Sequence, residues 1–446
     1  MTKSLPAFEH AARLRPIALV GTVLVQTSGD TSALGCPLAA PYAAAVATGI
    51  GPITRVSWRS GADLLEAVYA EGRVAIAVTS AGRTTLHRSR RFGRVPAGAE
   101  GLALTLTGSH LTALTCTNGD WTARARVDLS DRIDTRSEAW LAALEVGHDG
   151  PVQRLEAGRF GQLGLRDLRA VSHADGTPYR LDDGRVVLSA TSAGPGFFDT
   201  AHTSVWALDP TSLALEHLSD LFFRRPDRPG VYGDHATHVL RDGEGWLVAT
   251  STWGDFVTRR RDATVGVTLA RTSADVLAGA HVLDTEPLHL PTDGFDSVGV
   301  WDPHLVNTGW EWLVGYVSAR RFFRFHPVLA AGPSLDRLSV RGADPRRRAT
   351  EGTTLAQLPD DDRWVVLASD GREGRRGQRG RYPVLDLAMN EIGSLEAPYP
   401  TNIPWPTLIP ISGDRTLLVG FDGTPYGGAL AGYGTHGDVV IARSAR

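Results

Sequence analysis

The sequence predicts an all-β protein in which a five-bladed β-propeller follows a small antiparallel β-sandwich. Three observations support this prediction. One hairpin pattern recurs five times in the C-terminal part, neighbouring copies are roughly 50–65 residues apart, and the N-terminal part alternates apolar and polar residues over short segments. A chain of 446 residues is too long for one ordinary hydrophobic core, so a repeat-built domain with an accessory domain is expected.

The recurring pattern is a short apolar strand, a turn containing Gly or Asp, and a second apolar strand that ends in small residues. Such turn chemistry between β-rich flanks is typical of a hairpin. The copies are GTPYRLDDGRVVLSATS (176–192), THVLRDGEGWLVATST (237–252), PHLVNTGWEWLVGYVS (303–318), TTLAQLPDDDRWVVLASD (353–370) and PTLIPISGDRTLLVGFD (406–422). Strand-like runs between the copies supply a third and a fourth strand, so each copy is expected to begin one blade. A generic sandwich with accidental similarity is the alternative.

The N-terminal part has a different pattern. Segments such as EAVYAEGRVAIAVTSA and EGLALTLTGSHLTALTCT alternate apolar and polar positions between closely spaced turns, as strands of a sandwich do. We therefore divide the chain into an N-terminal segment (1–39), an accessory sandwich (40–155) and a propeller (160–446). The stretch TRSEAWLAALEVG (135–147) is expected to form a short helix between the two domains.

Composition narrows the classes of function. Hydrophobic residues make up 42% and charged residues 21% of the chain, as in an ordinary soluble protein. The net charge of −3 gives no reason to expect nucleic acid or an anionic membrane as a partner. Cys36 and Cys116 are too few for a disulfide framework or a zinc site built from cysteines, and whether they pair is left open.

The N-terminus contains one apolar run, PIALVGTVLV (16–25), which resembles the core of a signal peptide. Glu9 lies where such a peptide is basic, and no clean cleavage site follows. No segment approaches the ~20 apolar residues of a membrane span. We therefore expect a soluble, cytoplasmic protein, with secretion as the alternative.

Acidic residues precede four of the five hairpins. The entrances are HADG with Asp175, GDHA with Asp234, WDPH with Asp302 and ATEG with Glu351, whereas the fifth, IPWP, has Trp405. The first strand of a propeller blade lines the central channel, so these carboxylates are expected to converge at its mouth. Crowded carboxylates raise one another's pKa, which lets one serve as an acid while another stays ionised. Glycoside hydrolysis needs this pairing.

With these motifs the sequence resembles the five-bladed propeller enzymes of glycoside hydrolase family 43 and its relatives, which include arabinofuranosidases, xylosidases and arabinanases. HADGTPYRL stands where the family has its first Asp entrance, WDPHLV resembles its Asp-Pro entrance of the third blade, and TEGTTL resembles its Glu entrance of the fourth. The resemblance implies that Asp175 is the general base, Asp302 modulates pKa and orientation, and Glu351 is the general acid.

The resemblance covers roughly residues 165–425, and the sequence departs from the family pattern at two positions. Gly176 and Thr353 stand where the family favours proline. Asp234 is the rival of Asp175 for the role of base. Because the family inverts the anomeric centre, the resemblance implies a base and an acid about 6.5–9.5 Å apart.

Histidines and tryptophans near the same entrances are candidates for substrate binding. Indole rings stack on the apolar faces of sugar rings, and imidazoles hydrogen-bond to sugar hydroxyls. With the rival acid, the candidate substrate-binding residues are Asp234, His235, His238, Trp301, His304, Trp405, His202 and Trp253. For His238 and His304 a packing role in the core is the alternative, and the histidines at the channel mouth could also ligate an ion.

The sequence thus predicts a glycoside hydrolase that acts on an arabinose-type or xylose-type furanoside or pyranoside. Two alternatives stay open: a lyase acting on uronate polysaccharides, and a propeller that binds carbohydrate without cleaving it. We expect no cofactor and no catalytic metal, although the mouth of the propeller leaves a place for a structural Ca²⁺ or another cation at its axis. A carbohydrate is the expected partner, and the oligomeric state is left open.

Overall fold

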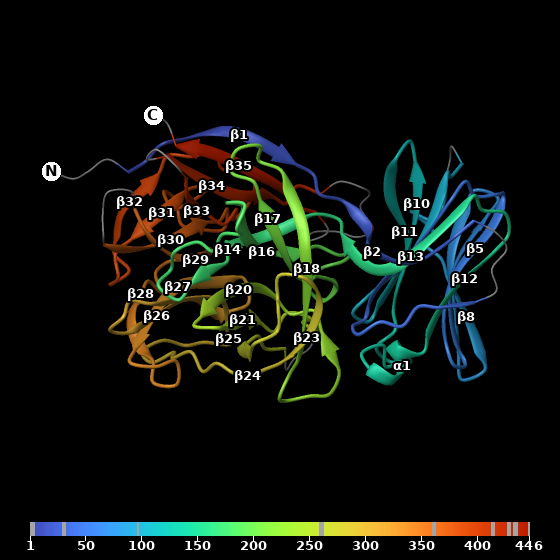
Figure 1. Cartoon of the computed structure of the whole chain (residues 1–446), viewed down its shortest axis with the longest axis horizontal. Helices are drawn as coiled ribbons and strands as arrows, with labels where there is room; N and C mark the ends of the chain where they lie inside the picture. The colour runs from blue at the N-terminus through green and yellow to red at the C-terminus, as the bar shows by residue number, and fades with distance from the viewer. Residues whose placement is uncertain are drawn as a thin grey trace.

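The computed structural model describes residues 5–28, 33–95, 98–257, 263–358, 363–411, 415–425, 430 and 436–444. Over these residues the chain is nearly all β, with one short helix, α1 (Glu138–Ala142), and one 3-10 turn, η1 (Phe198–Thr200). Two bodies lie side by side along the long axis, a sandwich and a propeller (Figure 1). The predicted fold class, a propeller with a preceding antiparallel sandwich, is confirmed.

The sandwich consists of two sheets. In order across it, the first sheet contains β11 (Asp120–Asp128), β10 (His110–Thr117), β9 (Gly101–Thr107), β4 (Tyr42–Thr48), β13 (Arg154–Gln162) and β2 (Ala18–Thr27). The second contains β3 (Leu34–Gly35), β12 (Leu144–Asp149), β5 (Ile53–Ser60), β6 (Asp63–Ala70), β7 (Arg73–Ser80) and β8 (Arg83–His87). Every second residue of β5 is buried, because successive side chains of a strand point to opposite faces.

Among the described residues, five further sheets form the propeller. The first sheet contains β14 (Leu165–Ala170), β16 (Val186–Ser192), β17 (His202–Leu208), β18 (Leu215–Arg224) and β19 (Val231–Tyr232), and β23 (Gly279–Asp284) pairs parallel with β18. The second sheet contains β15 (Ser172–His173), β20 (His235–Asp242), β21 (Gly245–Ser251), β22 (Val267–Thr272) and β24 (Glu286–Pro287). The third and fourth are β25 (Gly299–Asn307), β26 (Trp312–Arg321), β27 (Arg324–Gly332) and β28 (Ser339–Ala343), then β29 (Thr350–Gln357), β30 (Trp364–Asp370), β31 (Tyr382–Leu385) and β32 (Glu391–Leu395).

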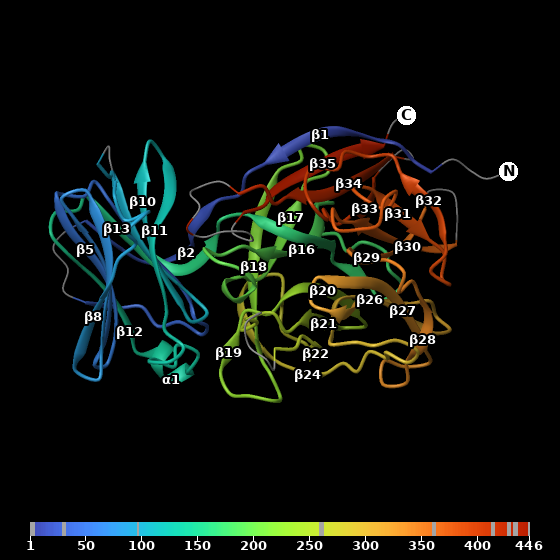
Figure 2. The ribbon, with the colours of Figure 1, turned by 180° about the vertical axis from the view of Figure 1, so that it is seen from behind.

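The last sheet joins the two ends of the chain. It contains β33 (Thr407–Ile411), β34 (Arg415–Asp422), β35 (Asp438–Ser444) and β1 (Phe8–Leu14), and β1 pairs antiparallel with β35. Both views show β1 running along β35 before the chain enters the sandwich through β2 (Figures 1 and 2). The chain returns from β13 to β14. The sandwich is therefore inserted between two strands of the propeller.

The predicted division at 1–39, 40–155 and 160–446 stays a prediction, to which the strand order adds detail. Within the segment 1–39, β1 belongs to a propeller sheet and β2 to a sandwich sheet. The helix expected over 135–147 is reduced to α1, and β12 follows it. Cys36 and Cys116 are both free thiols.

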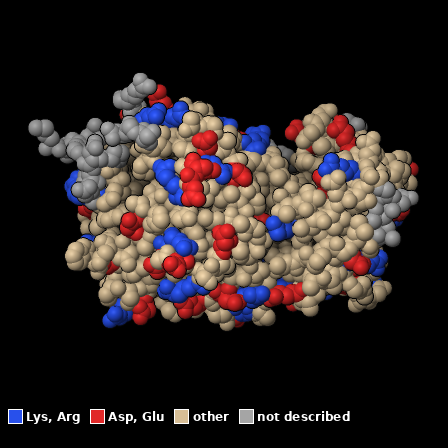
Figure 3. Space-filling view, in the orientation of Figure 1, with Lys and Arg blue, Asp and Glu red and all other residues tan. Residues whose placement is uncertain are grey.

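The outer surface has no unusual charge pattern on the face seen in Figure 3, where basic and acidic side chains are mixed. None of the described helices has the length and apolarity that crossing a bilayer requires. The innermost propeller strands position side chains at the mouth of the channel, so functional residues are expected there.

Candidate active site

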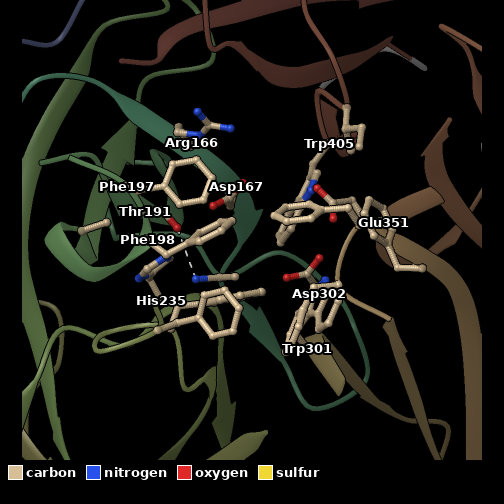
Figure 4. A pocket seen from close by; sticks show the side chains of 18 of the residues that line it. Arg166, Asp167, Thr191, Phe197, Phe198, His235, Trp301, Asp302, Glu351 and Trp405 are labelled. Atoms are coloured by element: carbon tan, nitrogen blue, oxygen red, sulfur yellow. Dashed lines mark hydrogen bonds between the residues drawn. The ribbon is translucent and has the colours of Figure 1, made fainter. Parts of the chain in front are cut away.

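A cavity of about 290 Å³ opens where the innermost strands of the blades begin. Its polar lining is Arg166, Asp167, Thr191, His235, Asp302, Glu351, Glu373 and Asn402. Its apolar lining is Phe197, Phe198, Ala201, Ala236, Trp253, Phe256, Trp301, Phe322, Phe323, Phe325, Ala349, Ile403 and Trp405. Figure 4 shows carboxylates and aromatic rings facing the same hollow.

The strands of four blades change direction at corresponding points of this mouth. The pairing register shifts in β14, β20, β25 and β29, and at each shift one residue has a left-handed backbone: Asp167 (φ 50°), Ala236 (φ 59°), Asp302 (φ 60°) and Gly352 (φ 74°). Bulges of this kind bend a strand and redirect its side chains. Left-handed backbone is costly for residues other than glycine and concentrates at functional sites. The bulges thus turn the strand entrances toward the cavity.

Three carboxylates from three different blades point into the cavity: Asp167 on β14, Asp302 on β25 and Glu351 on β29 (Figure 4). Asp302 is only 2% exposed, and its Oδ2 has no hydrogen-bond partner among the described residues. A buried carboxylate oxygen without a partner is costly unless it is protonated or meets a ligand. The arrangement is suited to proton transfer.

The pKa values of Glu351 and Asp302 are both raised by their surroundings. Burial and, after it, the nearby charge of Asp167 raise the pKa of Glu351 to about 8, against the opposing effects of Arg166 and of the indoles of Trp301 and Trp405. Burial likewise raises the pKa of Asp302 well above its usual range, assisted by the charges of Glu351 and Asp167. Glu351 is therefore protonated at neutral pH, as a general acid must be.

Side chains that come two residues after the bulges fill the channel next to the carboxylates. The Arg169 guanidinium crosses from β14 and donates hydrogen bonds to the backbone oxygens of Asp302 (3.0 Å) and Thr353 (3.1 Å). The rings of His238 and His304 stack with centroids 4.1 Å apart. Burial lowers the pKa of His238 to about 3, and it lowers the pKa of His304 well below its usual range. These neutral histidines and one cation form a floor under the acids.

A glycine is required beside the acid. A Cβ on Gly352 would lie 2.6 Å from Cδ1 of Trp405, and the left-handed φ of this residue disfavours any side chain. Trp405 also packs its ring 4.4 Å from the guanidinium of Arg169. The close approach of Trp405 to the backbone fixes one wall beside Glu351.

Six of the residues selected from the sequence line the cavity, namely Asp302, Glu351, His235, Trp301, Trp405 and Trp253. They come from the second, third and fourth blades and from the connection that enters the fifth. The hairpin entrances of these blades were placed correctly in the sequence, which explains why their residues converge.

Asp175 does not line the cavity. It is exposed in the loop after β15 and accepts hydrogen bonds from the backbone nitrogen (2.9 Å) and the hydroxyl (2.6 Å) of Thr177, which makes it a turn former. The physical reason is the position of the first strand. The innermost strand of the first blade is β14, which ends at Ala170, so the entrance of this blade lies ahead of Asp175.

Four other selected residues are buried away from the cavity lining. Both carboxylate oxygens of Asp234 accept hydrogen bonds from Arg225, and its Oδ1 also accepts one from the Gly254 backbone nitrogen (3.0 Å). His202 lies 3.2 Å from Asp220. His238 and His304 belong to the channel floor, where their Nδ1 atoms accept hydrogen bonds from backbone nitrogens of neighbouring blades. All four have structural partners in place of a substrate.

Asp167 was not selected from the sequence. It lies in the run LGLRDLRAV, which has no hairpin turn after it, and β14 pairs with β16 across a 15-residue connection that contains β15. A signal was present in the spacing. Asp167 precedes Arg169 by two residues, as Asp302 precedes His304, and both second members belong to the channel floor.

The sandwich contacts the loops that carry the aromatic lining. Arg136 donates hydrogen bonds to the backbone oxygens of Gly254 (2.7 Å) and Val231 (3.2 Å). Nδ1 of His110 lies 3.2 Å from Asp199, whose neighbour in sequence is Phe198. The accessory domain therefore touches the site indirectly, through the backbone of its walls.

Within the described part of the chain, no three His, Cys, Asp or Glu side chains form a group that could hold a metal ion. The sequence left a place for a structural cation at the axis, and this stays a prediction. The Arg169 guanidinium already supplies a positive charge on the channel side of Asp302.

No protein-family model matches the sequence, and no curated protein matches it. Solved structures of similar fold include the GH32 beta-fructofuranosidase of Bombyx mori (15% identity, 63% of this chain and 60% of that chain, TM-score 0.45). Another is the GH43_1 enzyme of Xanthomonas citri, at 14% identity over 63% of this chain and 86% of that chain, with a TM-score of 0.41. A third is a family 117 glycoside hydrolase of Zobellia galactanivorans, at 12% identity over 63% of this chain and 84% of that chain, with a TM-score of 0.44. This chain thus spans less than two thirds of the Bombyx mori enzyme. The solved structures to which this chain is similar thus include an enzyme of family 43, the family that the sequence resembles.

Proposed function

We propose that this protein is an inverting glycoside hydrolase that cleaves an arabinose-type or xylose-type furanoside or pyranoside. The observation that carries the proposal is the convergence of Asp167, Asp302 and Glu351 in one cavity, with Glu351 protonated at neutral pH. A protonated carboxyl group and a second carboxyl group beside a sugar-sized hollow are the minimum apparatus for hydrolysing a glycosidic bond.

In the proposed mechanism Glu351 donates its proton to the glycosidic oxygen as the bond to the anomeric carbon breaks. Asp167 accepts a proton from the water that attacks the anomeric carbon from the opposite face. Asp302, whose own pKa is raised, contributes a hydrogen bond beside the sugar. The products are a free sugar of inverted configuration and an alcohol, and the two carboxyl groups have exchanged protonation states.

Asp167 replaces Asp175 as the proposed base. Asp167 lines the cavity and its charge acts on both Asp302 and Glu351, whereas Asp175 is exposed in a turn. The pair supplies a matched test. D167N is expected to reduce kcat by about 10²–10⁴-fold, and D175N is expected to leave it within about twofold of the wild type. Equal losses in both variants would contradict the assignment of the base.

The acid is tested by varying the leaving group. A 4-nitrophenyl glycoside needs little protonation to leave, whereas an alkyl glycoside of the same sugar needs it fully. E351Q is therefore expected to lose about 10²–10⁴-fold activity on the alkyl glycoside and much less on the 4-nitrophenyl glycoside. A loss of the same size on both substrates would remove the acid role from Glu351.

The stereochemical outcome separates inversion from retention. Proton NMR during hydrolysis is expected to show the sugar released first in the opposite anomeric configuration, before mutarotation. Release with the original configuration would point to Asp167 as a nucleophile that forms a glycosyl-enzyme intermediate. Saturable binding of every tested oligosaccharide without cleavage would replace the enzyme proposal by a carbohydrate-binding propeller.

A further inference from the structure

The cavity has one wall that the proposed chemistry does not use. Rings from three blades are in contact along it: Phe197 with Phe198 (centroids 4.0 Å apart), Phe198 with Trp253 (4.4 Å) and Trp253 with Trp301 (5.2 Å). Figure 4 shows Phe197 and Phe198 across the hollow from Asp302 and Glu351. This aromatic wall faces the acids.

A second group of rings continues this wall to the outer surface. Phe256 contacts Phe322 (centroids 4.7 Å apart), which lies in the hairpin turn between β26 and β27. The next residue, Phe323, lines the cavity and is 56% exposed, with a left-handed backbone (φ 67°). Glycine or asparagine would adopt this conformation at lower cost.

The position of Phe323 is not explained by stability of the fold. An exposed phenylalanine gains little from burial, and its left-handed backbone costs on the order of 1–3 kcal/mol. The left-handed backbone follows from the two-residue turn between β26 and β27, so what stability leaves unexplained is a phenylalanine at a position that suits glycine or asparagine. Phe323 therefore gains its contacts when something apolar enters the cavity.

The aromatic wall is poorly suited to a second sugar. A sugar ring presents several hydroxyl groups at its rim, and each loses water hydrogen bonds when it is buried. On this side of the cavity, Thr191 accepts a hydrogen bond from the Ala236 nitrogen (3.2 Å) and Nδ1 of His235 is 3.0 Å from the Gly233 oxygen, while Arg166 and Asp167 lie at the edge nearer the acids (Figure 4). Phenylalanine rings offer no hydrogen bonds in exchange.

The aromatic wall also adjoins the acid. Trp301 belongs to it, and its indole lowers the pKa of the carboxyl group of Glu351 through a side-chain hydrogen bond. In the proposed mechanism this carboxyl group donates its proton to the leaving oxygen. The group attached to that oxygen thus leaves on the side of Trp301. A flat apolar group is the chemistry that these rings accommodate best, through stacked and edge-to-face contacts.

Resting on the proposed function, we infer that the leaving group of the natural substrate is a flat apolar aglycone, so that the substrate is an aryl or arylalkyl glycoside and not a polysaccharide. The sugar occupies the side with Asp167, Asp302 and Glu351. The aglycone lies between the Phe197–Phe198 pair and the Phe322–Phe323 turn, and Phe323 closes over its outer face.

The test compares leaving groups of similar acidity. Benzyl and ethyl glycosides of one sugar differ in apolar surface much more than in the chemistry of bond breaking. We expect kcat/KM for the benzyl glycoside to exceed that for the ethyl glycoside by about 30-fold, the effect of burying one phenyl group. The corresponding disaccharide is expected to be cleaved no faster than the ethyl glycoside. A ratio near one, or a preference for the disaccharide, would overturn the inference.

Substitutions in the turn between β26 and β27 test whether its aromatic rings cause the preference for the benzyl glycoside. Phe323→Asn suits the left-handed backbone, so the fold is retained, and the benzyl-to-ethyl ratio is expected to fall about 5–10-fold. Phe322→Leu keeps apolar volume but removes a flat ring and is expected to lower the ratio by a smaller factor. Trp310→Asn is the matched control, because Trp310 is an aromatic residue in another turn of the same blade, 93% exposed and absent from the cavity lining. An unchanged ratio in Phe323→Asn would contradict the inference.

A binding measurement separates this inference from the proposed function. Benzyl alcohol alone is expected to quench the tryptophan fluorescence of the wild type, and Phe323→Asn is expected to bind it at least fivefold more weakly. If no glycoside is cleaved but this pattern holds, the aromatic subsite stands and the hydrolase proposal falls. If glycosides are cleaved but benzyl alcohol does not bind at the site, the subsite is wrong and the hydrolase proposal stands.

Discussion

The hydroxyl group of Tyr42, the first residue of β4 in the sandwich, donates a 2.7 Å hydrogen bond to the backbone oxygen of Ala201 in the propeller. Both residues are buried, and Ala201 lines the cavity directly after the turn that carries Phe198. Together with Arg136, which holds the Gly254 oxygen, Tyr42 ties two loops of the aromatic wall to the neighbouring domain. The sandwich thus helps to set the width of the cavity.

Removing the Tyr42 hydroxyl is expected to loosen this loop. Tyr42→Phe keeps the ring but leaves the buried Ala201 oxygen without that partner, at a cost of about 1–2 kcal/mol in the free energy of unfolding. KM for the benzyl glycoside should rise, whereas kcat should change less. Trp140→Phe is the control, because the Trp140 indole donates its hydrogen bond to Asp63 within the sandwich. Equal changes in KM for the two variants would refute a positioning role.

The pH dependence of activity should show the ionisation of Glu351. Its pKa is about 8, so the carboxyl group is protonated below that pH and able to act as an acid. We expect kcat/KM on an alkyl glycoside to fall about tenfold per pH unit above pH 8. On the 4-nitrophenyl glycoside, E351Q should lack this alkaline limb. Persistence of the limb in E351Q would assign it to another group.

The same shift predicts how stability depends on pH. In the unfolded chain Glu351 ionises near 4.5, but in the folded protein it ionises only near 8, so the folded state loses stability as pH rises between these values. E351Q has no such group. Its melting temperature is expected to exceed that of the wild type by about 2–5 °C at pH 8.5 and to approach it at pH 5. Glu244→Gln, in an exposed hairpin turn, should show no such difference.

Much of the propeller could be predicted because its hairpins are local. The turn residues and the flanking apolar strands stand next to one another in the sequence, as in WDPHLVNTGWEWLVGYVS around Asp302. The first blade departed from this pattern. Its innermost strand β14 is separated from β16 by a connection that pairs partly with the second blade through β15, so the local hairpin pattern pointed to Asp175 and away from Asp167.

The burial of the other candidates depended on contacts that sequence spacing does not encode. Asp234 precedes its strand as Asp302 does, but Arg225 lies nine residues earlier and pairs with it inside the protein. His238 and His304 follow the bulges by two residues and so point into the floor of the channel, where their pKa values are depressed. Asp302 and Glu351 were predictable from their order in the chain, whereas the roles of Asp167, Asp175 and Asp234 were set by the tertiary structure.

Substituting the glycine beside the acid should separate positioning from chemistry. Gly352→Ala places a Cβ against Trp405 and forces alanine into a left-handed backbone. We expect a loss of about 10–100-fold in kcat, because displacement of Glu351 by a fraction of an ångström is costly to proton transfer. Gly309→Ala also has a left-handed backbone but meets no atom within 4 Å, so its effect should be limited to about 1 kcal/mol of stability. Full activity in Gly352→Ala would contradict the proposed placement of the acid.

The pairing of β1 with β35 has a consequence for the order in which the protein forms during synthesis. Phe8 pairs with Ser444, so β1 leaves the ribosome long before its partner β35 has been made. The strands of the sandwich are complete by Gln162 and can associate while the rest of the chain is still being translated. The propeller becomes a closed ring only after β35 has been made, and until then β1 is an edge available to the wrong neighbour.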